Sequence, residues 1–471
     1  MIKLNLDEVI TALRGEVKRA VKPVSVSGVS TDSRSIQLGE LFFALNGENF
    51  NGHQYVTDAA IRGAVGAVIN RAQYESVFRA LVGNSPGDFA LILVDDPLRA
   101  LGRLAHFHRT QVSAEVIAVA GSNGKTTTKG MIDHVLRTHR VGRAAPRSFN
   151  NAIGVPLTLL SVTGKDEYVV VEIGTNHPGE IAELARIAEP DLAVITSIDE
   201  EHLEGLGDLA GVAREEYSLL SFVRKGGFAA LSADAPFVRE NKILEQGICV
   251  SFGRAADADL RVSDIRYEHP IQRFRVNERF DYALQLPGAH NACNAAGAIA
   301  VARRLGMEHD AIAQALRTFA APAQRSHLVD VGGVMVLDDS YNANPGSVVA
   351  AIESFQTIPS HGRKFAVLGE MRELGPRSAE LHRQIARRAA QAQFHRVFLV
   401  GDVDGFVGAD DESLGLFRHG IECCADLDAC RDRLLDEIRP GDALLLKASR
   451  AVRLERLLQS LRDALDAAPA S

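Results

Sequence analysis

The stretch from Val116 to Thr128 constrains the fold of this chain more than any other. Five small or β-branched apolar residues run into a Gly-polar-polar-Gly-Lys-Thr-Thr turn, and a helical pattern of apolar residues follows. This order predicts a buried strand, a phosphate-cradling loop and a helix that begins beside the phosphate. Gly121 and Gly124 let backbone N–H groups face phosphate oxygens without obstruction by a Cβ atom. The stretch therefore predicts a phosphate site at the end of a strand.

The polar residues of the loop suit both phosphate and magnesium. Lys125 supplies a point charge for the outer phosphates, and the hydroxyl of Thr126 is a candidate Mg²⁺ ligand. Val119 stands where the usual phosphate loop has its first glycine, so the match is to a shortened variant. The alternative interpretation of this stretch alone is a chance glycine-rich turn between a strand and a helix.

Length and composition are those of a multidomain globular chain. The 471 residues are enough for about three domains of ~150 residues, and 46% hydrophobic with 24% charged residues is ordinary for soluble proteins. A net charge of −8 argues against nucleic acid as a partner. The five cysteines form neither a metal-binding spacing nor a disulfide framework, which favours a reducing, cytoplasmic location. Early acidic residues argue against a signal peptide, and no apolar run approaches the ~20 residues of a membrane span.

Residues 1–112 are interpreted as a mixed α/β domain. A buried-strand pattern at 39–45 lies between a polar cluster at 30–34 and a Gly/Asn-rich loop at 46–53. The hydroxyl, carboxylate and guanidinium groups of the cluster have the chemistry to bind the base and diphosphate of a nucleotide. The alternative is a solvated loop in which Arg34 forms an ordinary ion pair.

Residues 113–322 contain the phosphate loop and strands that alternate with helices, which predicts a parallel sheet. A buried strand at 168–174 carries Glu172 at its carboxyl end, where ligands bind in such sheets, so Glu172 is placed to hold Mg²⁺. His202 follows a later strand and is a candidate ligand of a second cation, although a lone histidine is more often structural. Polar and apolar residues alternate over 257–287, which predicts a small antiparallel extension of the sheet.

An alanine-rich helix follows that extension and begins with two asparagines. Asn291 and Asn294 share one helix face and carry the donors and acceptors that adenine recognition needs. Taken alone, the pair equally fits a helix cap and a surface residue.

Residues 323–471 alternate between strand and helix patterns, which predicts a Rossmann-like parallel sheet. No Gly-x-Gly-x-x-Gly follows the first strand, so a dinucleotide cofactor is not expected. The tail at 468–471 is expected to fray.

Taken together, these motifs resemble the Mur ligases, the ATP-dependent amide-forming enzymes of peptidoglycan precursor synthesis. The resemblance extends over the whole chain and rests on Ser-Thr-Asp-Ser-Arg (30–34), Leu-Phe-Phe-Ala-Leu-x-Gly-Glu-x-x-x-Gly-His (41–53), Gly-x-Asn-Gly-Lys-Thr-Thr (121–127), Glu-Ile-Gly-Thr-Asn (172–176), His-Leu-Glu-Gly (202–205), Gly-x-His-Asn-x-x-Asn (288–294), Asp-Asp-Ser-Tyr-Asn-Ala-Asn-Pro (338–345), Leu-Gly-Glu-Met-x-Glu-Leu-Gly (368–375) and Gly-Asp-x-Leu-Leu-x-Lys-x-Ser-Arg (441–450). The run at 338–345 is similar to that of the family members that add a dipeptide. No Asp-Asn-Pro-Arg motif, as used by the members that add the third amino acid, is present.

The resemblance implies an α/β fold of three domains. They are an N-terminal UDP-binding domain (1–112), a central P-loop-type ATPase domain (113–322) and a C-terminal Rossmann-like domain that binds the incoming dipeptide (323–471). The implied reaction joins D-alanyl-D-alanine to UDP-N-acetylmuramoyl-tripeptide through an acyl phosphate, with ATP and two Mg²⁺. A cytoplasmic monomer is expected. The alternatives are a neighbouring ligase of the superfamily, which adds the third amino acid or acts on folate, and a P-loop ATPase or GTPase switch.

The resemblance also assigns residues to roles. The catalytic residues would be Lys125, Glu172, His202 and Arg325. ATP would contact Gly121, Ser122, Asn123, Gly124, Lys125, Thr126, Thr127, His290, Asn291, Asn294, Arg325 and Asp339. The UDP substrate would contact Thr31, Asp32, Ser33, Arg34, Asn46, Gly47, His53, Thr175 and Asn176. The dipeptide side would be lined by Tyr341, Asn342 and Asn344, and the metal ligands would be Thr126, Glu172, His202 and Glu216.

Glu216 marks a departure from the family pattern. Many members carry a lysine on the helix after the His-Leu-Glu-Gly motif, and its carbamylation makes a Mg²⁺-binding carboxylate. This chain has no lysine between Lys165 and Lys225, and Glu216 stands at the matching position. The hypothesis is that Glu216, with a shorter side chain, replaces the carbamate.

Overall fold

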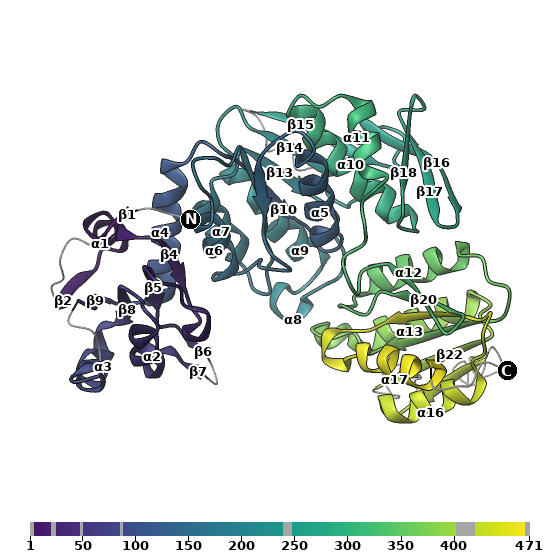
Figure 1. Ribbon diagram of the computed structural model, residues 1–471. Helices are drawn as coiled ribbons and strands as arrows, with labels where there is room; N and C mark the ends of the chain where they lie inside the picture. Colours follow the sequence, from purple (N-terminus) through teal and green to yellow (C-terminus); the bar gives the residue numbers. More distant parts are fainter. Residues whose placement is uncertain are drawn as a thin grey trace.

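The computed structural model describes residues 4–19, 25–47, 50–84, 88–238, 247–401 and 420–466. Its strands form large sheets of five, nine and six strands that follow one another along the chain, one in each of three lobes (Figure 1). The predicted α/β class with mainly parallel sheets is confirmed. The tail at 468–471, predicted to fray, lies outside the described residues. Within the described ranges, no helix is long and apolar enough to cross a membrane.

The N-terminal lobe is a mixed five-stranded sheet with helices on both faces, in the order β2-β9-β8-β5-β4. Alternate residues of the interior strand β9 explain the two layers: Leu91 and Leu93 pack with α2 and α3, and Ile92 with α1 and α4. The elements are β1 (Leu4–Asn5), α1 (Leu6–Leu13), β2 (Glu16–Arg19), β3 (Ser25–Val26), β4 (Gly28–Ser30), β5 (Glu40–Phe43), β6 (Asn46–Gly47), β7 (Phe50–Asn51), α2 (Val56–Ile61), β8 (Gly66–Asn70), α3 (Tyr74–Leu81), β9 (Ala90–Val94) and α4 (Pro97–Gln111).

The central lobe has the strand order β11-β12-β10-β13-β14-β15-β16-β17-β18. Pairing is parallel from β11 to β16 and antiparallel from β16 to β18, so the antiparallel extension is confirmed. The elements are β10 (Glu115–Ala120), α5 (Lys125–Leu136), β11 (Gly142–Ala144), α6 (Gly154–Leu160), β12 (Tyr168–Glu172), α7 (Glu180–Ala188), β13 (Leu192–Ile195), α8 (Leu203–Leu206), α9 (Leu209–Tyr217), β14 (Phe228–Ser232), β15 (Ile248–Gly253), β16 (Leu260–Glu268), β17 (Ile271–Val276), β18 (Phe280–Leu284), α10 (Ala289–Arg304) and α11 (His309–Leu316).

The C-terminal lobe has the strand order β19-β20-β24-β21-β22-β23, parallel except for the β19–β20 pair. The sequence did not predict β19 or β23, which are the two edge strands of this sheet. Pro376 lies in a 3₁₀ turn directly before α13. The elements are β19 (His327–Val331), β20 (Val334–Asp338), α12 (Pro345–Thr357), β21 (Lys364–Gly369), α13 (Ser378–Gln391), β22 (Arg396–Val400), β23 (Ile421–Cys424), α16 (Leu427–Glu437), β24 (Ala443–Lys447) and α17 (Glu455–Asp466).

Candidate active site

The central sheet brings three polar strand ends to one place. The phosphate loop follows β10, Glu172 ends β12, and Thr196 follows β13; β10 lies between the other two strands. Val119 pairs with Glu172 across the sheet, so the carboxylate lies beside the start of the loop. After β10 the chain forms β11 and β12 on one side of this strand, and then crosses to β13 on the other side. Such a switch point is where open α/β sheets bind ligands.

Two glycines allow the loop to fit closely between its neighbours. Gly121 and Gly124 have φ values of 115° and 84°, a region that disfavours residues with a Cβ. A Cβ on Gly121 would lie 2.4 Å from Oγ1 of Thr196, and one on Gly124 would lie 2.3 Å from Oδ1 of Asn294. The loop is thus fixed from both sides, and α5 begins at Lys125 with its first N–H groups free of intrahelical partners.

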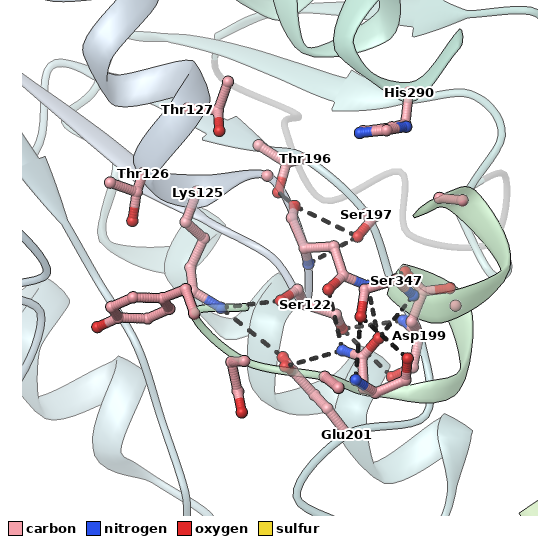
Figure 2. Close-up of a pocket in the computed structure, with 18 of the residues that line it drawn as sticks. Ser122, Lys125, Thr126, Thr127, Thr196, Ser197, Asp199, Glu201, His290 and Ser347 are labelled. Carbon is pink, nitrogen blue, oxygen red and sulfur yellow. Dashed lines mark hydrogen bonds and ion pairs between the residues drawn. The ribbon is translucent and has the colours of Figure 1, made fainter. Parts of the chain in front are cut away.

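A cavity of about 1910 Å³ lies at this loop, between the central and C-terminal lobes. Figure 2 shows how part of its wall is built from the loop, from the segment after β13 and from the start of α12. The predicted site residues that line it are Ser122, Asn123, Gly124, Lys125, Thr126, Thr127, Glu172, Thr175, Asn176, His202, His290, Asn291, Asn294, Arg325, Asp339, Tyr341, Asn342 and Asn344. Most of the predicted ATP and dipeptide residues therefore share one cavity.

The predicted UDP residues of the N-terminal lobe do not line this cavity. Asp32 accepts hydrogen bonds from the Arg34 guanidinium at 2.9 and 2.7 Å, and these bonds lower the pKa of Asp32 to about 2. The Arg34 side chain is exposed. Among Thr31, Asp32, Ser33 and Arg34, the structure thus shows the local ion pair that the sequence left as the alternative. Of the 46–53 loop, residues 48 and 49 lie outside the described residues.

His53 is buried and forms hydrogen bonds between two segments of this lobe. Its Nε2 accepts a hydrogen bond from the backbone N–H of Asn70 at 3.0 Å, and its Nδ1 lies 3.1 Å from Oδ1 of Asn46. The ring is therefore neutral with its proton on Nδ1, and burial lowers the pKa of His53. The structure gives His53 the role of joining the loop to β8.

We expect His53 to make the protein sensitive to acid. Below the ordinary histidine pKa of about 6.5 the unfolded chain binds a proton that the folded ring resists, so the free energy of unfolding falls as pH decreases, by at most ~1.4 kcal/mol per pH unit. Above that pH the contribution is complete. Denaturant unfolding at pH 7.5, 6.5 and 5.5, followed by circular dichroism, should show a smaller acid loss in H53Q than in wild type. H139Q changes an exposed histidine and is the control; equal acid loss in wild type and H53Q would contradict the expectation.

Glu172, a predicted Mg²⁺ ligand, is held by three donors. Its Oε2 accepts from the hydroxyl of Thr126 at 2.9 Å and pairs with Nζ of Lys129 at 3.0 Å, while its Oε1 accepts from Asn150 at 3.2 Å. The sequence analysis missed Lys129, although it stands one helical turn after Lys125. A buried carboxylate with such partners is fixed in place, and the adjacent hydroxyl suits Mg²⁺.

Lys125 turns back onto its own loop. Its ammonium donates to the carbonyl oxygens of Gly121 at 2.5 Å and Ser122 at 3.2 Å, and it lies 3.8 Å from Oε1 of Glu201. Burial alone would lower the pKa of Lys125, but the carboxylates of Glu201 and Glu216 outweigh it and raise the pKa. The charged ammonium of Lys125 is thus held against the phosphate loop by these contacts (Figure 2).

The structure does not bring Glu216 to the cavity wall. The side chain is fully buried, and its Oε2 accepts from the backbone N–H of Gly121 at 2.6 Å. Its other oxygen has no hydrogen-bond partner, and burial raises the pKa of Glu216 to about 7. The Glu216 carboxylate binds the backbone of the loop and does not line the cavity, so this geometry gives its predicted metal binding no support.

His202 and the C-terminal lobe meet at the edge of the cavity. The histidine has a left-handed backbone, with φ of 50°, and its Nδ1 hydrogen-bonds to Oε2 of Glu373. Nε2 lies 3.8 Å from Oε2 of Glu201. Because Glu373 fixes one ring nitrogen, the other is oriented toward the cavity residue Glu201.

Asn344 joins the C-terminal lobe to the phosphate loop. Its amide and that of Asn123 exchange two hydrogen bonds, at 3.1 and 3.0 Å, although the residues lie 221 positions apart. The same side chain caps α12 by accepting from the N–H of Ser347 at 2.9 Å. These partners occupy both ends of the Asn344 amide, so its contact with a dipeptide remains a prediction.

The remaining C-terminal residues form two pairs. The Arg325 guanidinium lies 3.9 Å from the centre of the Tyr341 ring, and the Tyr341 hydroxyl donates to Ser148 of the central lobe at 2.9 Å. Asp339 forms an ion pair with Lys447 at 2.5 Å. The sequence motif at 441–450 contains Lys447, but no role followed from it.

The wall behind the phosphate loop carries the predicted adenine residues. Asn294 donates to Oδ1 of Asn291 at 3.3 Å, and Asn291 donates to the carbonyl of Pro287 at 2.8 Å. His290 lies between the hydroxyls of Ser326 and Ser354, at 3.4 and 3.5 Å, and burial lowers its pKa. The structure brings all three predicted residues together at the start of α10.

Comparison with known proteins gives a consistent result over the whole chain. The family models for the Mur ligase middle domain, the Mur ligase glutamate ligase domain and the Mur ligase family catalytic domain match residues 119–302, 324–450 and 25–109. The UDP-N-acetylmuramoyl-tripeptide–D-alanyl-D-alanine ligase of Bacillus subtilis is 31% identical, covering 98% of this chain and 99% of the relative.

Solved structures agree with these matches. A crystal structure of MurF from Acinetobacter baumannii has a TM-score of 0.87 at 26% identity, covering 98% of this chain and 99% of that one. MurF ligase from Thermotoga maritima in complex with ADP has a TM-score of 0.80 at 27% identity, covering 94% and 98%.

Proposed function

Because this chain belongs to the Mur ligase family, we propose that it is an ATP-dependent ligase that joins D-alanyl-D-alanine to UDP-N-acetylmuramoyl-tripeptide. The products are UDP-N-acetylmuramoyl-pentapeptide, ADP and phosphate. One observation carries the proposal: the phosphate loop and the C-terminal residues predicted for the dipeptide line the same cavity. A ligase needs this arrangement because the activated acid and the amine must meet.

The reaction forms an amide from a carboxylate that is unreactive at neutral pH. A carboxylate oxygen of the tripeptide attacks the γ-phosphorus of ATP, and ADP leaves. The dipeptide amine then attacks the acyl carbon, and phosphate leaves. Lys125 and Arg325 would hold the phosphate oxygens and offset their developing charge. Lys125 is preorganised for this role by its contacts with the loop carbonyls.

The residues around the loop fit Mg²⁺. Among the described residues no group of three acidic, histidine or cysteine side chains converges on one point. Mg²⁺, however, is usually held by one or two carboxylates together with substrate phosphates and water. Thr126 and Glu172, with 2.9 Å between their oxygens, would hold one ion, and His202 stands near the place of a second. Bound Mg²⁺ would neutralise charge on the transferred phosphoryl group.

The nucleotide and the UDP substrate would enter from different sides. We place adenine at His290, Asn291 and Asn294, behind the phosphate loop, and the ribose at Asp339. The UDP substrate would extend from Thr175 and Asn176, which line the cavity, toward the N-terminal lobe; Leu98 at the start of α4 lines the cavity on that side. The N-terminal contacts at 31–34, 46, 47 and 53 stay predictions.

Phosphate release tests this function directly. With ATP, Mg²⁺ and UDP-N-acetylmuramoyl-tripeptide, we expect phosphate release to depend on D-alanyl-D-alanine, because the amine completes the reaction. Mass spectrometry should show a product heavier by the dipeptide minus one water. Dipeptide-independent hydrolysis would instead indicate an ATPase switch. Turnover only with a dipeptidyl precursor and a diamino acid would indicate the neighbouring ligase.

A further inference from the structure

Glu201 is a cavity-wall carboxylate that the reaction described above does not use. It precedes His202 in the segment between β13 and α8, and its side chain is 8% exposed. It lines the cavity, and Figure 2 shows it pointing toward the Lys125 side chain. Its Oε1 has no hydrogen-bond partner and lies 3.8 Å from the Lys125 ammonium. Its Oε2 lies 3.5 Å from the amide nitrogen of Asn344.

A buried carboxylate oxygen without a hydrogen bond requires an explanation. Burial of such a group costs free energy unless a charge or a donor compensates it, and few native polar atoms are left this way. The Lys125 ammonium lies 3.8 Å from this oxygen, outside hydrogen-bond range, so a cation entering the cavity would compensate the Glu201 carboxylate.

The geometry around His202 supports a cation at this position. Its Nε2 is 3.8 Å from Oε2 of Glu201, and ligand atoms at ~2.1 Å from one Mg²⁺ lie about 3–4 Å apart. Its Nδ1 is held by Glu373, the carboxylate–histidine arrangement that orients metal-binding imidazoles. Oε2 of Glu201 and Nε2 of His202 are thus spaced as two ligands of one cation, and both residues line the cavity.

Glu216, at the position of the family's modified lysine, is oriented differently. Its carboxylate accepts a hydrogen bond from the backbone N–H of Gly121 at 2.6 Å, and Glu216 does not line the cavity. The two carboxylates therefore differ in their surroundings: Glu201 lines the cavity, and Glu216 is bound to the backbone of the phosphate loop.

We infer that Glu201, together with His202, binds a divalent cation in the cavity, and that Glu216 is a positioning residue that supports the phosphate loop. This inference rests on the proposed function, because phosphate oxygens of the bound nucleotide complete the coordination. Glu201 would thus supply the metal-binding carboxylate that a carbamylated lysine provides in other family members.

Mn²⁺ binding tests the assignment without relying on turnover. Electron paramagnetic resonance of the full chain with a non-hydrolysable ATP analogue and UDP-N-acetylmuramoyl-tripeptide should count about two Mn²⁺ per chain in wild type. In E201Q the count should fall to about one, whereas E216Q should keep about two. E201D, which retains the charge on a shorter arm, should keep both ions, with the second bound ~10-fold more weakly or worse.

Several outcomes would overturn the inference: two ions in E201Q, one ion in wild type, or the loss of an ion in E216Q but not in E201Q. Circular dichroism of each variant shows whether it is folded. If E201Q does not fold, the weakened second ion in E201D provides the test. Dipeptide-dependent turnover of wild type, measured on the same preparation, tests the ligase function separately. Failure of the metal assignment is thus distinct from failure of the proposed reaction.

Discussion

Replacement of Lys125 by methionine is expected to slow dipeptide-dependent phosphate release by ~10²- to 10³-fold, the usual cost of removing one preorganised charge from a developing oxyanion. The physical reason is the buried position of the ammonium, which two loop carbonyls hold at 2.5 and 3.2 Å. Methionine preserves the length and apolar character of the side chain but not its charge. Single-turnover rates at saturating ATP would separate the chemical step from nucleotide binding.

Lys364 offers a matched control for this prediction. Its ammonium also donates to two carbonyls, those of Phe355 at 3.0 Å and Gln356 at 2.9 Å, but it does not line the cavity. K364M should therefore keep its turnover within a few-fold of wild type. If K125M were as active as K364M, phosphate stabilisation by Lys125 would be refuted.

The second large effect is expected at Arg109, where replacement by methionine should lower the free energy of unfolding by ~3–5 kcal/mol. The Arg109 side chain is 1% exposed and lies in the last turn of α4, the helix that leads from the N-terminal into the central lobe. Its guanidinium donates to Asp191 at 2.6 Å and to the carbonyls of Ala188 and Glu189, each at 3.0 Å. Its loss leaves one buried carbonyl, one partly buried carbonyl and the partly buried Asp191 carboxylate without this donor.

Arg224 contacts the same carboxylate from the surface and serves as the control. Its side chain is 43% exposed and lies 3.6 Å from Asp191, so R224M should cost at most ~1 kcal/mol. Denaturant unfolding followed by circular dichroism measures both variants, and hydrogen exchange at the carboxyl end of α7 locates the change. Equal losses in R109M and R224M would show that burial does not distinguish the two ion pairs.

The sequence by itself determined the local structure at the centre of the site. The strand, glycine-containing loop and helix at 116–136 follow from residues adjacent in the chain, because apolar periodicity and turn chemistry act over short distances. The same holds for the antiparallel extension after residue 257 and for the strand that places Glu172. The order of the motifs along the chain was enough to identify the family to which the protein belongs.

Only the tertiary structure decided which side chains become partners. Asn123 and Asn344 meet across 221 positions, and the hydrogen-bond partners of Arg109 lie about 80 positions away, so no local pattern could identify them. The same limit applies to two acids of the central lobe: Glu201 lines the cavity, and Glu216 accepts a hydrogen bond from the backbone of the loop. The composition and spacing of the sequence do not distinguish these two carboxylates. Their roles depend on burial and on the direction of the backbone, which are fixed only when the sheet and its helices pack together.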